Sequence, residues 1–273
     1  NLSTASFSWS GITVNQPGTS QTLDILATRL MNRLQYRNFG THEVLLTNHT
    51  VNADGEGQCG VRWYELRNTG EGWSIYQQGT FAPDDGDNRW MASVAMNDNG
   101  DIGLGYSVSS STTYPAIRYA GQTASNSGTG ILDVAETEIF AGSASQSGIN
   151  RWGDYSKISV DPSDGETFWY TTEYSTGGWA WRTRIASFDL LASSIVMNPT
   201  TKDTSSASGS YSVAVAANVD WTVSETCSWV SITNGSGTDD GSFTVTYTEN
   251  TSTTTPRSCT ITVSGEGSRK PQH

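Results

Sequence analysis

Basic residues are scarce in this sequence, which has 15 lysines and arginines against 27 aspartates and glutamates and a formal net charge of −12. Nucleic-acid binding replaces the counterions of the phosphate backbone with protein cations, so this balance excludes nucleic acid as a partner. A run of 18 apolar residues, which a membrane-spanning helix needs, is also missing, and we expect no membrane insertion.

Sustained helical periodicity is the next absence. Only residues 22–38, with leucines spaced like one helical face, would allow a short helix. The 28 glycines, 10 tryptophans and 11 tyrosines, with abundant Ser and Thr, are typical of short strands and many turns. The composition therefore predicts an all-β protein.

Catalytic signatures are missing as well. The sequence holds neither a GxSxG elbow nor a phosphate-binding loop, and none of its many acids is marked as one of the two carboxylates that a glycosidase needs. We therefore favour a protein that binds over one that catalyses.

An internal repeat is the most informative feature present. Residues 88–111 and 150–175 both open with Asn-Arg-Trp, run through an alternating stretch, turn on an Asp/Asn/Gly cluster and return through a second strand-like stretch. The two Arg-Trp pairs are 62 positions apart. A repeat of this length built of strands and turns indicates stacked sheets of the propeller kind.

The strand-like segments group into three blade-like units within residues 1–192. They are 33–39, 42–51, 60–67 and 74–81; then 90–96, 101–109, 115–121 and 137–143; then 154–160, 167–175 and 181–190. A stray strand at 7–14 precedes them. Three blades cannot close a ring, so we expect a partial propeller whose missing blades come from the same precursor or from another chain.

The sequence pattern changes after residue 192. Short alternating strands separated by Gly, Asn and Ser turns over 193–265 predict a small β-sandwich, followed by a tail at 266–273. Trp221, the CSWVSI segment with Trp229, the glycine-rich turn, Asn250 and Arg257 together resemble the BACON domain. That resemblance implies an immunoglobulin-like module of secreted or cell-surface proteins and, by the family's name, carbohydrate binding.

The first region carries resemblances of its own. The string RWGDYSKISVDPSDGETFWYTTEY is similar to a group of large secreted bacterial proteins, and SDGETFW at 163–169 is loosely similar to the turn box of sialidase-type propellers. The second resemblance implies an alternative function, a propeller-type carbohydrate-active enzyme such as a sialidase or another glycosidase with its site at the axial opening.

Arg37, Arg89 and Arg151 begin the innermost strand of successive blades. If they converge on a central opening, they would bind a carboxylated sugar through charge-assisted hydrogen bonds. The other interpretation, which we favour, is that each arginine is a structural strut paired with a nearby acid.

Acidic turns follow the first strand of two blades. Asn97, Asn99 and Asp101 lie in one turn, and Asp161 and Asp164 in the other. Clustered oxygen ligands around glycine suit calcium, the cofactor these turns would hold. The same residues are also standard hairpin residues, and we favour plain turns and no cofactor.

Cys227 and Cys259 both fall in the sandwich and would form a disulfide if the protein is secreted, while Cys59 has no partner in its own region. The sequence as a whole predicts a secreted or cell-surface interaction scaffold. Its expected partners are glycans or a surface polymer.

Overall fold

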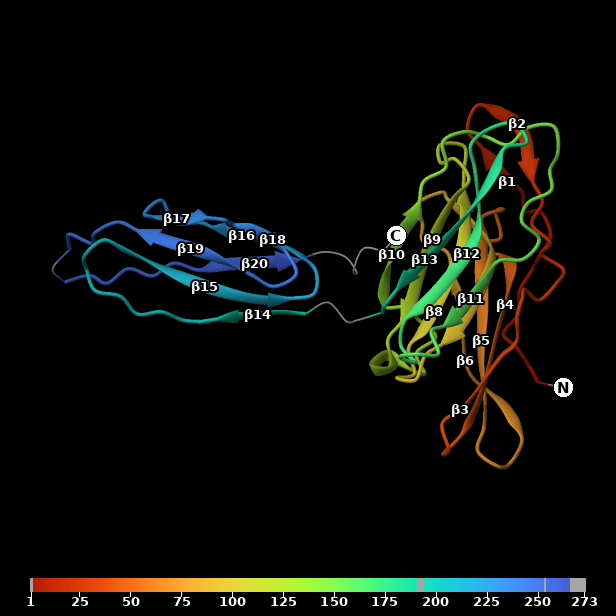
Figure 1. The fold of residues 1–273 in the computed structure, drawn as a ribbon, viewed down its shortest axis with the longest axis horizontal. Helices are drawn as coiled ribbons and strands as arrows, with labels where there is room; N and C mark the ends of the chain where they lie inside the picture. The colour runs from red at the N-terminus through yellow and green to blue at the C-terminus, as the bar shows by residue number, and fades with distance from the viewer. Residues whose placement is uncertain (1, 191–193, 253, 266–273) are drawn as a thin grey trace. The chain divides into compact units, whose positions relative to one another are not determined.

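The structure is a computed structural model that describes residues 2–190, 194–252 and 254–265 (Figure 1). Antiparallel sheets dominate the described residues, and a 3-10 turn at Ala124–Asn126 is the only helical element among them. The expected all-β class is confirmed. None of the described helical structure is long and apolar enough to cross a membrane. The described residues separate into two compact units, 2–190 and 194–265.

Three antiparallel sheets make up most of the first unit. Within each sheet the strands are neighbours in chain order. The first sheet holds β3 (Gln35–Asn38), β4 (Glu43–Asn52), β5 (Cys59–Asn68) and β6 (Trp73–Phe81); the second holds β7 (Asn88–Met96), β8 (Ile102–Ser109), β9 (Ala116–Gln122) and β10 (Val134–Phe140); the third holds β11 (Lys157–Val160), β12 (Phe168–Ser175) and β13 (Trp181–Phe188). These are the strands that the repeat predicted, with shifted ends.

The three sheets pack face to face around two apolar cores. One core joins the first and second sheets through residues such as Leu46, Trp63 and Leu104. The other joins the second and third sheets. Consequently the second sheet is covered on both faces, and every residue of β7 and β8 is buried.

Glycines in β8 allow the third sheet to approach closely. A Cβ at Gly103 would lie 2.8 Å from the ring of Phe168, and one at Gly105 would lie 2.6 Å from the ring of Tyr170. Two aromatic rings of β12 therefore rest directly on the backbone of β8.

The N-terminal segment differs from the expectation. The stretch 7–14 is not a stray strand without partners, since Ser8 forms a bridge with Asn52 and β1 (Val14–Gln16) pairs with β2 (Thr19–Leu23). The short helix that 22–38 would allow is absent, because β2 ends and β3 begins inside that stretch. Leu30 and Leu34 are exposed, so the leucine spacing did not mark a buried helical face.

The second unit consists of two antiparallel sheets around a shared core. Val213, Trp221, Phe243 and Val245 lie at its centre. One sheet has the order β14 (Ile195–Asn198), β15 (Gly209–Ala217), β19 (Gly241–Tyr247), β17 (Val230–Thr233); the other has the order β18 (Ser236–Thr238), β16 (Asp220–Glu225), β20 (Ile261–Gly265).

Cys227 and Cys259 are joined by a disulfide in this unit, with their Cα atoms 6.0 Å apart. The pairing links the segment before β17 to the segment before β20. Cys59 is a buried free thiol, and burial raises its pKa to about 12. The predicted tail at 266–273 lies outside the described residues.

Candidate functional site

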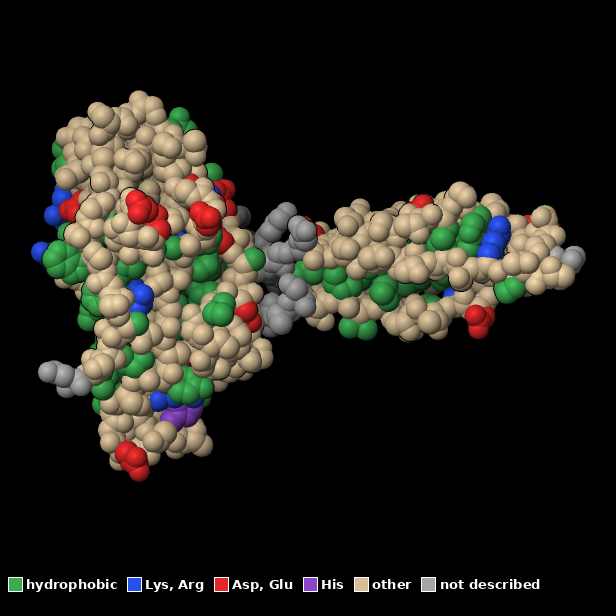
Figure 2. All heavy atoms as spheres, turned by 180° about the vertical axis from the view of Figure 1, so that it is seen from behind, with side chains coloured by type: hydrophobic (Ala, Val, Ile, Leu, Met, Phe, Trp, Pro, Cys, Tyr) green, Lys and Arg blue, Asp and Glu red, His purple; other side chains and the backbone are tan. Residues whose placement is uncertain are grey.

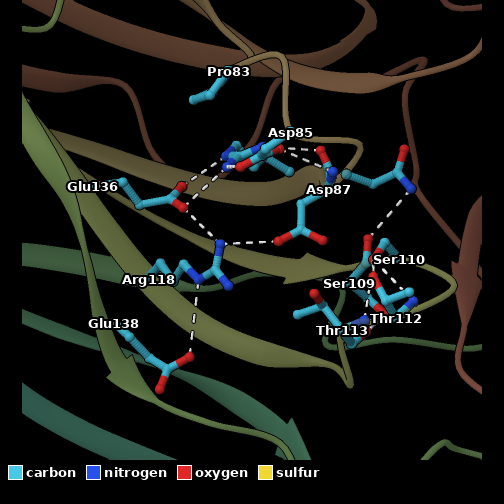
Figure 3. Close-up of polar contacts among 12 residues, drawn as sticks. Pro83, Asp85, Asp87, Ser109, Ser110, Thr112, Thr113, Arg118, Glu136 and Glu138 are labelled. Carbon is cyan, nitrogen blue, oxygen red and sulfur yellow. Dashed lines mark hydrogen bonds and ion pairs between the residues drawn. The ribbon is translucent and has the colours of Figure 1, made fainter.

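A network of ionised side chains crosses one face of the second sheet (Figure 3). Arg89, fully buried in β7, is its centre. Its Nε and Nη2 donate to the two carboxylate oxygens of Glu136 at 2.7 and 3.0 Å. Its Nη1 and Nη2 donate to the two oxygens of Asp85 at 3.0 and 2.6 Å. The guanidinium is thus held by two bidentate pairs, the strongest geometry available to it.

Arg118 and Tyr106 complete the network. The Nη1 of Arg118 donates to Glu136 at 2.7 Å and to Asp87 at 3.0 Å, and the Tyr106 hydroxyl donates to Glu136 at 2.6 Å. Tyr106 and Arg118 are direct cross-strand partners in β8 and β9, and Arg118 pairs in register with Glu138 of β10. Strand alternation therefore places these groups on one face.

The electrostatics of the network keep Glu136 ionised. Burial alone would raise the pKa of Glu136, but the hydrogen bonds and charge of Arg89, helped by Tyr106 and Arg118, outweigh burial and lower it. Burial would likewise lower the pKa of Arg89, yet its pairs with Asp85 and Glu136 raise it. A general acid needs a carboxyl that holds its proton near neutral pH, so Glu136 is unsuited to that role.

The structure does not bring the three predicted arginines together. Arg89 lies at the start of β7, whereas the Nε of Arg37 donates to the carbonyl of Met96 at the end of that strand. The backbone positions of Arg89 and Met96 are roughly 23 Å apart along an extended strand. Arg37 pairs with Asp98. Arg151 precedes β11, is exposed and pairs with Asp154. The separation of Arg37 from Arg89 argues against the convergence that was the less favoured interpretation, and each arginine has an acidic partner, as the favoured strut interpretation predicts.

The acidic turns bond largely within themselves. Asn97 donates to Asp101 at 2.9 Å and accepts from the backbone of Asn99 and Asp101. Asp161 accepts from Ser163 and from the indole of Trp169, and Asp164 accepts from Glu166 and Thr167; these bonds lower the pKa of both carboxyls. No group of three or more His, Cys, Asp or Glu that could hold a metal occurs among the described residues. These bonds fit the plain-turn interpretation, and calcium binding stays the less favoured prediction.

A polar groove of about 390 Å³ lies near the Asp85 end of the network. Its acids are Asp54, Glu56 and Asp84. Asp54 accepts hydrogen bonds from the backbone of Glu56, Gly57 and Gln58, which lower the pKa of its carboxyl. The groove offers acceptors and no cation, so it would suit neutral or cationic groups.

An exposed aromatic surface lies on the third sheet. Phe168, Tyr170, Ala186 and Phe188 face the second sheet, so by alternation the residues between them face away. Trp169, Trp181 and Ile185 are 41%, 58% and 64% exposed. We call these three residues the aromatic face. The indole Nε1 of Trp169 donates to Asp161 at 2.8 Å, which fixes the orientation of its ring.

Sequence reasoning missed the roles of Glu136 and the aromatic face. An arginine lies in the third predicted strand of each unit, at Arg62, Arg118 and Arg184. This repetition was a signal for the network, because an arginine inside a sheet requires acids on neighbouring strands. No family model matches this chain, and a search of curated proteins finds no significant match.

Proposed function

We propose that this chain is a secreted or cell-surface interaction protein that binds an extracellular polymer, glycan or matrix material. The aromatic face is the observation that carries the proposal. Exposed apolar and aromatic side chains gathered on one sheet face mark interaction sites, and Trp169, Ile185 and Trp181 are spread along the strands of the third sheet, which suits an extended partner. The resemblance to secreted proteins and the Cys227–Cys259 disulfide support an oxidising, extracellular setting.

One position in the second strand carries a different kind of residue in the second and third sheets. The first and second strands pair at Met96 and Ile102 in the second sheet, and at Val160 and Phe168 in the third. The residues that follow, Gly103 and Trp169, therefore occupy equivalent positions. Gly103 has no side chain, so the Phe168 ring of the next sheet packs against its backbone, whereas the side chain of Trp169 occupies the corresponding space on the third sheet. This contrast supports a polymer ligand on the aromatic face over another sheet packed in the same way.

The finer architecture is part of the proposal. The first strands of the three sheets are neighbours: Gln35 of β3 bonds the backbone of Met96 in β7, and Ser93 of β7 accepts from the backbone of Ile158 in β11. Adjacent first strands support three consecutive propeller blades, and two sheets around one core support an immunoglobulin-like, BACON-type second unit. The missing blades stay a prediction, and a blade packed on the third sheet would compete with the polymer for the aromatic face. Light scattering on the chain tests this prediction, and a monomer would contradict it.

Glu173 favours a second candidate function, a carbohydrate-active enzyme. Burial raises the pKa of its carboxyl, and the nearby charge of Asp154 raises it further, against a hydrogen bond from the backbone of Gly153. A carboxyl with a raised pKa is what a glycosidase uses as its acid. Release of reducing sugar by the chain, abolished in Glu173→Gln, would establish this alternative.

Loss of the aromatic face should abolish polymer binding. We expect the chain to co-sediment with at least one of a panel of insoluble polysaccharides and cell-wall preparations. The affinity of the double variant Trp169→Ala/Trp181→Ala should fall by at least roughly tenfold, to the point that co-sedimentation is lost, because central aromatic residues dominate binding energy. Trp9→Ala, which removes a tryptophan that is 52% exposed and outside this face, is the matched control and should bind normally. Equal binding by both variants, or no binding to any polymer, would contradict the proposal.

A further inference from the structure

The third sheet has one strand fewer than the other two. The first and second sheets each hold four strands, and their fourth strands, β6 and β10, pair with β5 and β9. The third sheet ends at β13, and β12 is the only strand that pairs with β13 among the described residues (Figure 1). An unpaired edge strand presents backbone N–H and C=O groups that can pair with another chain. The outer edge of β13 is therefore a candidate binding surface.

Arg184 of β13 and Arg118 of β9 occupy equivalent positions. The second and third strands pair at Tyr106 and Arg118 in the second sheet, and at Thr172 and Arg184 in the third. Tyr106 is the fifth residue of β8, and Thr172 is the fifth residue of β12. The position that Arg118 holds in the charged network thus recurs at Arg184 on the edge of the third sheet.

In both four-stranded sheets, the fourth strand supplies a partner for the Nε atom of the third strand's arginine. The Nε of Arg118 lies 3.9 Å from the carboxylate of Glu138, its cross-strand partner in β10. The Nε of Arg62 donates to the hydroxyl of Thr80 in β6 at 2.6 Å. The Nε of Arg184 is buried and has no hydrogen-bond partner within the part of the chain that the structure describes. A buried donor without an acceptor is unfavourable, so a strand that brings an acceptor to Arg184 would be stabilised.

Recognition of such a strand has to be local. The guanidinium of Arg184 lies over the ring of Phe140, 5.1 Å from its centroid, which helps to hold it in place. Figure 2 shows the side of the first unit that is turned away in Figure 1, where charged side chains of both signs lie in small separate groups. That side offers no broad basic field, and the chain has a net charge of −12. An acid on the partner is therefore selected by direct pairing with Arg184 and not by long-range attraction.

We propose that the outer edge of β13 binds an extended segment of another polypeptide chain, which adds an antiparallel fourth strand to the third sheet and places an aspartate or glutamate opposite Arg184. Backbone hydrogen bonds supply the affinity of such a complex, and the paired side chains supply its specificity. Two copies of this chain paired through β13 would bring Arg182 and Arg184 of both copies close together, which disfavours a second copy as the partner. The surface is the edge of the sheet and not the aromatic face, so the inference does not rest on the proposed function.

A capped peptide with the sequence of β10, VAETEIF, tests this edge. It is the strand that pairs with the equivalent arginine, Arg118, in the second sheet. Fluorescence anisotropy of the labelled peptide with the full chain measures affinity. We expect binding to the wild type, and at least tenfold weaker binding both by the peptide with its two glutamates replaced by glutamine and by the Arg184→Gln variant. Lys157→Gln, which removes a cation from β11 at the other edge of the same sheet, is the matched control and should leave binding unchanged.

Methylation of the peptide backbone tests strand pairing separately from charge. Successive backbone N–H groups of a strand point to opposite edges. Of two peptides, one methylated on every second backbone nitrogen and the other on the remaining nitrogens, only one should therefore bind. Trp169→Ala should bind the unmethylated peptide normally, which separates the edge of β13 from the aromatic face.

Several results would overturn the inference. They are an absence of binding by the β10 peptide at millimolar concentration, equal affinity of the glutamate and glutamine peptides, unchanged affinity in a folded Arg184→Gln variant, and binding of both methylated peptides. The two peptides compared on the wild type keep the test decisive if Arg184→Gln fails to fold. A dimer of the chain that dissociates when the β10 peptide is added would assign the edge to a second copy, and would likewise overturn it.

Discussion

Replacing Arg89 with alanine should lower the free energy of unfolding of the first unit by about 3–5 kcal/mol. Arg89 is fully buried and is the bidentate partner of both Asp85 and Glu136. Its removal leaves Glu136 in a largely buried position with Arg118 as its remaining cation. Urea unfolding at neutral pH measures the effect. Arg151→Ala, which removes an exposed arginine, is the control, and equal stability of the two variants would contradict this account.

The pH dependence of the same measurement follows from Glu136. Its pKa is lower in the folded protein than its ordinary value of 4.5, so it stabilises the fold above that value. This contribution is lost as the pH falls through the folded pKa. The Arg89→Ala variant lacks the main cause of the lowered pKa. The difference in stability between wild type and variant should therefore shrink on acidification below about pH 4.

Removal of the disulfide should be the other large effect. The double variant Cys227→Ala/Cys259→Ala opens a loop that spans 32 residues, and chain entropy predicts a loss of about 3–4 kcal/mol from the second unit. Thermal unfolding with and without reductant measures it. Reductant should destabilise the wild type and leave the double variant unchanged. A wild-type second unit that is indifferent to reductant would contradict the structural role of this bond.

The strands of the first unit could be predicted from sequence because their patterns are local. Alternation and turn residues mark β8 and β12, and the repeat assigns them equivalent places. The face of each residue also follows from alternation, which places Trp169 opposite Phe168. Whether a face is covered depends on which sheet packs against it. The sequence alone therefore could not show that Gly103 meets another sheet while Trp169 remains exposed.

The charged site was harder to predict for the same reason. Arg89 lies on β7 and Glu136 on β10, 47 residues away and at opposite edges of one sheet, so only the folded sheet brings them together. Arg37 and Arg89 do not converge, although the sequence left that alternative open, because equivalent positions in a repeat do not place two side chains at the same height along neighbouring strands. The helix that residues 22–38 would allow is absent for a related reason. Its leucines have helical spacing, but Leu30 and Leu34 are exposed and no apolar core among the described residues includes them.

Hydrogen exchange of the full chain with and without a bound neutral polysaccharide tests the central claim most directly. The polysaccharide is taken from those retained by co-sedimentation, in soluble oligomeric form. The account predicts slower amide exchange over residues 168–188, which include β12, β13 and the turn between them, with little change in the first sheet. Protection confined to the first sheet or to the second unit, with none over 168–188, would contradict it.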